Sequence, residues 1–513
     1  MIIKKAKKTK VQASQAFPWH VLLFAIYPIL ALLAHNISQV APASALLPLG
    51  FSVVGAGLLL LLLRLWLHDW QRAALATTIL LVLFFSYGHV YSYLKGVKVS
   101  GIYLFRHRTM APLWIVLAGL GVWWARRRKP DVRGLTRLLN VVGVVLLIFP
   151  VIQVGSGLWK QWRAWERSSP TAPNPVVGAG GGAADQTSPD IYYIILDGYG
   201  RADILQELYG YDNSEFLSSL ENMGFYVANC SMSNYSQTEL SLASSLNYDY
   251  LSALGNSFVP ENTDRSPLWP LIKNSAVRIY LESRGYKTIA FKTGFSWTEL
   301  TDADLFLAPQ LSKRQLDGFQ YMWLQTTFVR MLLDTEALSM LKNPDDQSRQ
   351  RTKFVLEQLQ EIPSIDGPKF VFAHLVIPHQ PFVFGPNGEA ISIASDATAD
   401  MSAQAYVDQV IFINKQMEII LAKIIADSPT PPIIIIQGDH GPSGWGMINR
   451  MLNLGAYYFP GHEDMLYPTI TNVNAFRIVF DEYFGQDLPL LPDISLFPDN
   501  SHDFKQVEND CSQ

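Results

Sequence analysis

The sequence predicts two kinds of fold in one chain: an all-α bundle of about five transmembrane helices, then an α/β domain with a mainly parallel sheet flanked by helices. Charge separates the two parts. Residues 1–189 hold 20 Lys and Arg against 4 Asp and Glu, whereas residues 190–513 hold 20 against 40. A basic apolar part and an acidic polar part are suited to different surroundings. We therefore expect a transmembrane domain at 1–160, a flexible linker at 161–189 and a water-facing domain at 190–513.

Long apolar runs predict the membrane helices. They lie at about 17–35, 44–65, 73–94, 111–125 and 138–157. Each is close to the roughly 20 residues that a helix needs to cross a bilayer, although the fourth run is short. The second contains FSVVGAGLLLLLLRLW, which has no polar face of the kind that a helix on the surface of a soluble core shows. Their repetition also argues against a cleaved signal peptide.

Positive charges in the short loops predict the orientation. The N-terminal tail and the loops after the second and fourth runs share one side and carry 13 Lys and Arg, while the opposite loops carry only Lys95, Lys98, Arg106 and Arg108. Cytoplasmic loops are the ones enriched in positive charge. We expect a multi-pass protein of the cell membrane, with the lipid bilayer as a partner and residues 190–513 in the periplasm or outside the cell.

The predicted linker is rich in Gly, Pro and Ala, as in the stretch SSPTAPNPVVGAGGGAADQTSP at 168–189. The chain has two cysteines, Cys230 and Cys511, which are too few for a disulfide scaffold. An oxidising compartment would permit one bridge, but the sequence leaves open whether the two side chains meet.

Short apolar strands alternate with helical patterns after residue 190. Strands are expected at 191–196, 225–229, 288–291, 369–377, 432–438 and 455–459, and helices at 238–251 and 405–425. Several of these strands are apolar throughout, which is typical of a parallel sheet covered on both faces. Because ligands of such sheets bind beyond the carboxyl ends of the strands, the residues just after each strand are the ones to inspect.

Two of these strand ends carry potential metal ligands. Asp197 follows IYYIIL directly, and Asp439 and His440 follow PIIIIQG. Either motif alone could be a simple turn, but together two carboxylates and an imidazole predict a site for one divalent ion, with Zn²⁺ or Mn²⁺ as the best candidates.

A candidate nucleophile lies near a predicted helix start in SNYSQTELSLASSLN. Ser236 and Glu239 have the spacing of a capping box, so we expect Ser236 to cap the helix. Thr238 would then lie in the first turn, where free backbone N–H groups and the helix dipole favour an anion. An isolated Thr at such a position is usually only a local cap.

His374 and His379 lie at and just beyond the strand end in FAHLVIPHQPF. The part of the chain after residue 190 has only five histidines, so two of them here suggest a site, although His374 could equally be a hydrogen-bonded core residue.

These motifs, in this order, resemble the alkaline phosphatase/sulfatase superfamily over about 190–500. The membrane anchor followed by an outer catalytic domain resembles lipoteichoic acid synthases and lipid A phosphoethanolamine transferases. The resemblance implies an alkaline-phosphatase-like sheet, a metal held by Asp197, Thr238, Asp439 and His440, Thr238 as the nucleophile, and His374 and His379 as substrate-binding residues. The stretch at 238–242 has Thr238 where sulfatases have the Cys or Ser that becomes formylglycine, and it lacks the Pro and Arg of that motif. The only spare histidines are His462 and His502, which favours a single metal.

The expected function is a metal-dependent transferase or hydrolase acting on phosphate esters of lipid head groups or envelope glycans through a threonine nucleophile. A sulfuric-ester hydrolase of the same superfamily is an alternative. A non-catalytic membrane protein, with a structural metal site that binds an envelope polymer or a partner, is another. No nucleic-acid partner is expected.

Overall fold

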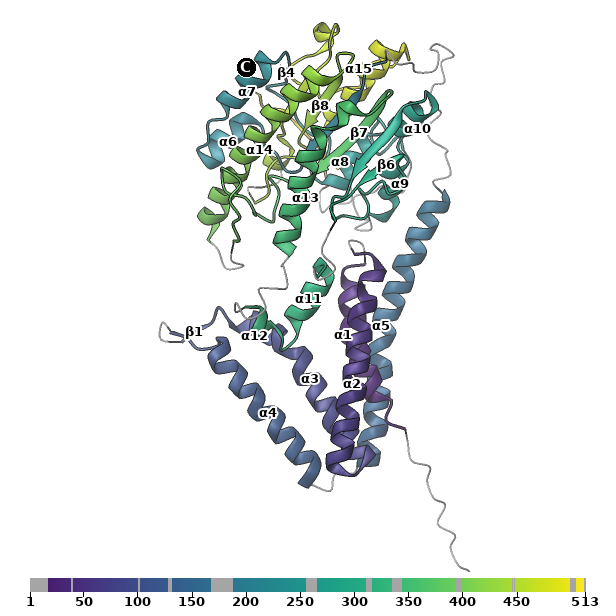
Figure 1. Cartoon of the computed structure of the whole chain (residues 1–513), viewed down its shortest axis with the longest axis vertical. Coiled ribbons are helices and arrows are strands. Elements are labelled where there is room, and N and C mark those ends of the chain that lie inside the picture. The colour runs from purple at the N-terminus through teal and green to yellow at the C-terminus, as the bar shows by residue number, and fades with distance from the viewer. Residues whose placement is uncertain are drawn as a thin grey trace, which may run out of the picture. The chain divides into compact units, whose positions relative to one another are not determined.

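The computed structural model describes residues 17–37, 40–99, 102–127, 132–167, 188–254, 265–310, 316–334, 344–393, 398–444, 446, 448–498 and 504–511. It divides the chain into two compact units. We call residues 1–158 with 316–341 the helical unit, and residues 159–315 with 342–513 the sheet unit. Figure 1 shows the helices of the first and the layered sheet of the second.

The helices of the N-terminal region follow the predicted apolar runs. They are α1 (His20–His35), α2 (Leu46–Leu67), α3 (Trp70–Leu94), α4 (His107–Arg127) and α5 (Val132–Arg167), with a 3₁₀ turn η1 (Pro42–Ala45) before α2 and a small hairpin of β1 (Lys98–Val99) and β2 (Ile102–Tyr103). Among the described residues, three helical stretches are long and apolar enough to cross a membrane: Pro42–Leu67, Trp70–Leu94 and Val132–Lys160. Helix α3 packs against α1, α2 and α4, and so forms the centre of this bundle.

Helix α5 continues to Arg167, so residues 161–167 of the predicted linker are helical. The sequence KQWRAWER at 160–167 contains no Gly or Pro to end a helix, which explains the extension. Residues 168–187 of the predicted linker lie outside the described residues.

A segment distant in sequence belongs to the helical unit. Residues 316–341 group with the N-terminal helices, and α11 (Gly318–Thr326) packs against α1, α2 and α3. The fit is close at Gly88 of α3, where a Cβ atom would lie 2.0 Å from the carbonyl oxygen of Gln325. The division at 160 and 190 expected from the sequence did not include this return of the chain.

The sheet unit is built on one mixed sheet in the order β4-β9-β8-β3-β7-β5-β6. Its strands are β3 (Ile191–Leu196), β4 (Tyr226–Val227), β5 (Lys287–Phe291), β6 (Leu305–Leu307), β7 (Lys369–Leu375), β8 (Ile433–Gln437) and β9 (Gly455–Tyr458). Strands β8, β3, β7, β5 and β6 are parallel, and β9 is antiparallel to both of its neighbours. The predicted α/β fold with a mainly parallel sheet is therefore confirmed. Strand β6 and a separate antiparallel pair, β10 (Ser495–Pro498) and β11 (Phe504–Val507), were not predicted.

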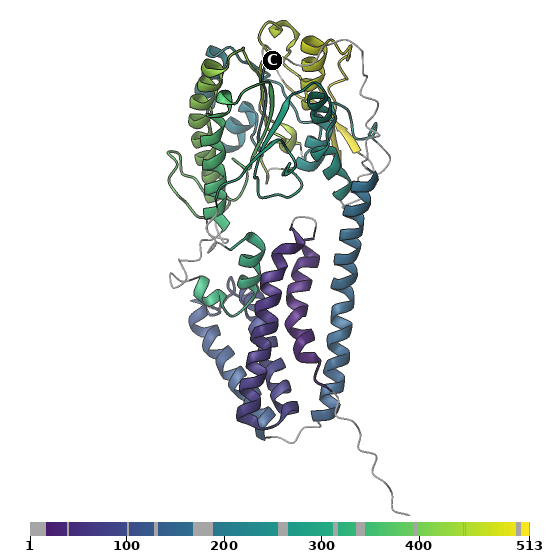
Figure 2. The same ribbon diagram turned by 45° about the vertical axis from the view of Figure 1, so that its right-hand side comes forward.

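Helices cover both faces of this sheet (Figure 2). One face packs on α6 (Ala202–Tyr209), α7 (Ser214–Asn222), α13 (Pro344–Leu359) and α14 (Ala399–Asp427), and the other on α8 (Thr238–Ser245), α9 (Trp269–Lys273), α10 (Ala276–Ser283) and α15 (Asn472–Phe484). Along β3, Tyr192, Ile194 and Leu196 enter the first core, and Ile191, Tyr193 and Ile195 enter the second. Burial of both faces explains why β3 has no polar alternation.

The structure joins Cys230 and Cys511 in a disulfide, with Cα atoms 5.6 Å apart. The bridge ties the C-terminal end of the described chain to the segment that follows β4. It resolves the question that the sequence left open.

Candidate active site

The neighbouring strands β7, β3 and β8 bring the predicted site residues together. Strand β3 lies between the other two, with Ile195 paired to His374 on one side and to Gln437 on the other. Asp197 follows β3, and Asp439 and His440 follow β8 after Gly438. Since the strands are parallel, their carboxyl ends meet at one edge, as the sequence predicts.

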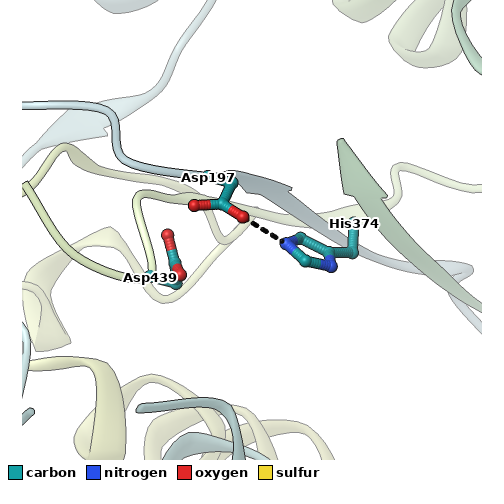
Figure 3. Close-up of side chains that lie close together, drawn as sticks. All are labelled: Asp197, His374 and Asp439. Carbon is teal, nitrogen blue, oxygen red and sulfur yellow. Dashed lines mark hydrogen bonds and ion pairs between the residues drawn. The ribbon is translucent and has the colours of Figure 1, made fainter. Parts of the chain in front are cut away.

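The two carboxylates are buried, and each uses one oxygen within the protein. Figure 3 shows the Asp197–His374 interaction beside Asp439. Asp197 Oδ2 lies 3.2 Å from His374 Nε2, and Asp439 Oδ1 accepts a hydrogen bond of 3.0 Å from the Gly198 N–H. Gly198 has φ +73°, a conformation that glycine adopts without strain. The other oxygens, Asp197 Oδ1 and Asp439 Oδ2, are buried and have no hydrogen-bond partner in the described part of the chain.

His440 faces those two free oxygens. Its Nδ1 lies 2.7 Å from the Gly441 carbonyl oxygen, to which it can only donate, so in the neutral imidazole Nε2 carries the lone pair. Nε2 lies 3.3 Å from Thr238 Oγ1, 3.5 Å from Asp439 Oδ2 and 3.7 Å from Asp197 Oδ1. Atoms of the other three predicted ligands therefore lie within 3.7 Å of His440 Nε2.

This donor set fits a divalent cation. Two buried carboxylate oxygens without partners are unfavourable unless a positive charge lies between them. Asp197, His374 and Asp439 also offer ligand atoms within 4.8 Å of one another. His374 Nε2, however, is directed at the oxygen of Asp197 that is already satisfied, whereas His440 Nε2 faces the two that are not. The geometry favours His440 as a direct ligand and His374 as the residue that orients Asp197.

Thr238 is the first residue of α8, and its side chain is half-buried. The predicted cap is wrong, because the N-cap residue is Gln237 and no side chain caps this helix. Ser236 is buried before the helix, in a segment whose backbone bridges Leu452 through Met232 and Leu496 through Tyr235. These long-range contacts, and not a local capping box, decide where α8 begins.

Nearby charges set the ionisation of the site's carboxyl groups. Burial alone would raise the pKa of Asp197, but the imidazoles of His379, His374 and His440 lower it below its ordinary value. Burial raises the pKa of Glu239, and Asp197 and Asp439 add to that rise while Arg265 opposes it. Asp197 is therefore ready to bind a cation as a carboxylate.

His379 borders a cavity of about 290 Å³ next to the metal-ligand candidates. Its ring lies 6.2 Å from that of His440, and its backbone N–H donates to the Asp197 carbonyl oxygen at 3.0 Å. The cavity is also lined by Gly198, Tyr406, Phe382 and Ser443, among others. Apolar walls with a few polar groups at one end are typical of a substrate pocket.

Sequence reasoning missed two residues at this site. Arg450 NH2 lies 3.3 Å from His440 Nε2, and the buried Arg450 Nε has no partner among the described residues. Tyr406 holds the loop after Asp197, because its hydroxyl donates to the Gly198 carbonyl oxygen at 2.9 Å and accepts from the Gly200 N–H at 3.1 Å. Arg450 follows no strand and Tyr406 comes from the middle of α14, so no local pattern marks either of them.

Of the two spare histidines, only His462 is among the described residues, and it pairs with a carboxylate elsewhere. His462 Nδ1 pairs with Glu482 at 2.9 Å on another part of the unit, and His502 lies outside the described residues.

The family model described as sulfatase matches residues 189–480, more than half of the chain. No curated protein was found to match the sequence. Among solved structures, the C-terminal periplasmic domain of EcEptC from Escherichia coli matches at 12% identity and a TM-score of 0.40, over 64% of this chain and 96% of that one. The lipooligosaccharide phosphoethanolamine transferase A (EptA) of Neisseria meningitidis, an integral membrane protein, matches at 10% identity and a TM-score of 0.37, over 90% of this chain and 94% of that one. Structural similarities at this level do not identify the protein, so the assignment rests on the family model. By that match, the chain belongs to the sulfatase family of enzymes.

Proposed function

We propose that the sheet unit transfers or hydrolyses phosphate ester groups, with Thr238 as the nucleophile and one divalent ion held by Asp197, Asp439, His440 and Thr238. One observation carries the proposal. Thr238 Oγ1 lies 3.3 Å from a His440 nitrogen that also faces two buried carboxylate oxygens without partners. A divalent ion bound there, Zn²⁺ or Mn²⁺ by its donor set, would lower the pKa of the threonine hydroxyl and offset the charge on the phosphoryl oxygens.

Each group of the protein then has its own role in the reaction. Thr238 gives its proton to a water molecule, its Oγ1 forms a bond to phosphorus, and the bond from phosphorus to the leaving oxygen breaks. The free N–H groups at the start of α8 and the Arg450 guanidinium bind the phosphoryl oxygens, where negative charge develops. An acceptor hydroxyl or water then displaces Thr238. Transfer and hydrolysis therefore share the first step and differ only in the molecule that attacks in the second.

His379 serves at the substrate pocket, because it borders the cavity beside His440. The departing alcohol takes up a proton there, from His379 or from water. His374 is only 2% exposed and bonded to Asp197, so we assign it to holding that carboxylate and leave substrate contact to His379.

The substrates we propose are phosphate esters of lipid head groups or envelope glycans. The support is the placement of the enzyme on a helical unit with three stretches able to span a membrane. A sulfuric-ester hydrolase is disfavoured, because the residue at the nucleophile position is Thr238 and 238–242 lacks the residues for formylglycine.

The decisive test is the covalent intermediate. The protein is incubated with a labelled phosphodiester, quenched and digested, and the modified peptide is located by mass spectrometry. A phosphorylated Thr238 supports the proposal. Turnover without any adduct, or an adduct on another residue, contradicts it.

We also propose that the sheet unit lies outside the cytoplasm, on the strength of the 13 positive charges in loops on one side against four on the other. Protease added to intact cells stripped of any outer barrier should cut within 190–513. Cleavage only after the cell membrane is opened would reverse the orientation.

A further inference from the structure

The helical unit contains a cavity of about 400 Å³ between α2, α3 and α4. Its walls include Phe51 and Leu59 of α2, Leu80 and Phe84 of α3, Ile115 of α4 and Phe328 from the returning segment. The hydroxyl of Ser52, which also lines it, is already used in a hydrogen bond of 2.7 Å to the Ala25 carbonyl oxygen. The walls are otherwise hydrocarbon, apart from the indole Nε1 of Trp323, which is buried and has no hydrogen-bond partner among the described residues.

The returning segment closes this cavity and is held in place by polar contacts. The Phe328 N–H donates to the Phe84 carbonyl oxygen at 2.9 Å, and its ring lies 4.8 Å from that of Tyr87. His107 of α4 bonds the Tyr87 hydroxyl at 2.7 Å and Asp334 at 2.8 Å. Arg330 adds a bond of 3.2 Å to the Gly88 carbonyl oxygen. The wall that carries Phe328 is therefore a fixed part of the bundle.

The physical properties of the cavity restrict its occupant. Water needs two to four polar partners and is a poor filling for a space like this one. The cavity is open on the side of Phe51 and Ile115, each 62% exposed, so in a bilayer its apolar walls would meet lipid chains rather than water. A hydrocarbon chain satisfies the walls, and the bilayer around α2 and α3 is its natural source.

Basic residues gather at the end of α3 and the start of α4, two of the helices that line the cavity. Residues 95–108, which join α3 to α4 and include the first two residues of α4, carry Lys95, Lys98, Arg106 and Arg108 and no acidic residue. Lys98 and Arg108 are exposed. These are the four positive charges on the side of the bundle where the orientation rule leads us to expect few. Basic residues beside a membrane attract anionic lipid head groups.

We propose that this cavity binds one acyl chain of an anionic membrane phospholipid, whose phosphate lies against the cations of residues 95–108. The inference does not depend on the chemistry at Thr238. It assigns a lipid site to the helical unit and gives the returning segment 316–334 the role of closing that site.

Two glycines of α2 provide a matched test. A Cβ at Gly55 or Gly57 would meet no atom within 4 Å, and both positions are exposed, but only Gly55 lines the cavity. The full-length protein is placed in vesicles of phosphatidylethanolamine and phosphatidylglycerol, with a trace of phosphatidylglycerol that carries a diazirine near the end of one chain. After irradiation, the labelled peptides are identified by mass spectrometry.

We expect labels on the cavity-lining parts of α2 and α4 and on the peptide that contains Phe328. Gly55→Leu should reduce this labelling about tenfold, since displacing about two buried methylene groups weakens binding by about that factor. Gly57→Leu should label like the wild type. Replacing Lys98 and Arg108 by Gln should remove the preference for phosphatidylglycerol over a phosphatidylcholine probe with the same chain.

Other results overturn the proposal. Equal labelling in Gly55→Leu and Gly57→Leu would show that the chain does not occupy the cavity. Labels spread evenly over all apolar helices would show ordinary contact with the bilayer. A different molecule found in the cavity after extraction, such as a quinone, would replace the phospholipid. A thermal unfolding curve for each variant confirms that it is folded, and turnover of a soluble phosphodiester tests Thr238 separately.

Discussion

At the strand ends of the sheet unit, polar atoms meet in the interior: Asp439 and His440 have no exposed surface, and two carboxylate oxygens lack partners among the described residues. The cavity of the helical unit is the reverse, a space of about 400 Å³ lined by Phe, Leu, Ile and Trp side chains. In the first region, two buried carboxylate oxygens lack a positive charge beside them in the described part of the chain. In the second region, a space between helices is not filled by side chains. Each deficiency indicates its ligand, a cation in one case and a hydrocarbon chain in the other.

The two regions also differ in how they are held. The active-site residues follow strands whose register is set by a sheet buried on both faces, so their positions depend on a large core. The cavity depends on a segment that returns from the sequence of the other unit and is held at Tyr87, Gly88 and His107. Substitutions in each region can test this contrast, and their expected effects on turnover range from large to small.

The largest effect is expected for Thr238→Ala. Loss of the attacking oxygen should lower kcat by on the order of 10⁴-fold or more, while the free energy of unfolding changes by no more than about 1–2 kcal/mol. Turnover of a soluble phosphodiester and thermal unfolding measure the two quantities. Ser236→Ala is the control, because Ser236 does not cap α8 and should keep most of the activity. Equal losses in both variants would mean that the helix start, and not the hydroxyl, had been disturbed.

The metal is the second test of the contrast. We expect about one divalent ion per chain in the purified protein, and we expect Asp439→Ala and His440→Ala to lose it, because the remaining ligands cannot hold it with the same affinity. Elemental analysis gives the stoichiometry. His462→Ala is the matched control, since its imidazole is paired with Glu482 away from the site. Two ions per chain, or full metal content in the Asp439 variant, would contradict the ligand set.

A smaller effect on turnover is expected for Arg450→Ala. If the guanidinium binds a phosphoryl oxygen, its loss should lower kcat/KM by about 10- to 1,000-fold with the metal content unchanged. Arg450→Lys should recover part of the activity, because lysine keeps the positive charge. Recovery should be incomplete, because lysine lacks the planar donors of the guanidinium. Lys423, which pairs with Asp427 near the C-terminal end of α14, provides a control substitution away from the site. Loss of metal in Arg450→Ala would instead show that Arg450 acts by holding His440.

Features could be predicted from the sequence where one short segment contains both the structural pattern and the functional residues. Strand β3 and the four isoleucines of β8 are apolar, and Asp197, Asp439 and His440 stand within three residues of the strand ends, so chemistry and position could be inferred together. The same holds for the helices of the bundle, where apolar length alone is sufficient.

Features that depend on contacts between distant segments could not be predicted. The start of α8 is set by backbone bridges from Met232 and Tyr235 to Leu452 and Leu496, which override a good capping spacing. Arg450 reaches His440 from a 3₁₀ turn that carries no motif. The return of residues 316–341 to the helical unit rests on close packing at Gly88 and on the His107–Asp334 pair, neither of which is visible in local sequence.

The smallest effect on turnover is expected for Cys511→Ser, although it should clearly lower stability. The bridge to Cys230 spans 281 residues, and Asn509 beside it donates to the Cys230 carbonyl oxygen at 2.7 Å and accepts from Arg201 at 3.2 Å. Cross-linking a loop of this length restricts the unfolded chain and typically stabilises a protein by about 2–4 kcal/mol. Loss of the bridge should lower the Tm of the sheet unit by roughly 3–6 °C. Turnover at 25 °C should stay within about twofold of the wild type, because the strands that position Asp197 and Asp439 have their own core. A reductant should lower the Tm of the wild type by a similar amount and leave Cys511→Ser unchanged. Sensitivity to the reductant in both proteins, or a collapse of activity in the variant, would mean that the C-terminal segment supports the active site directly.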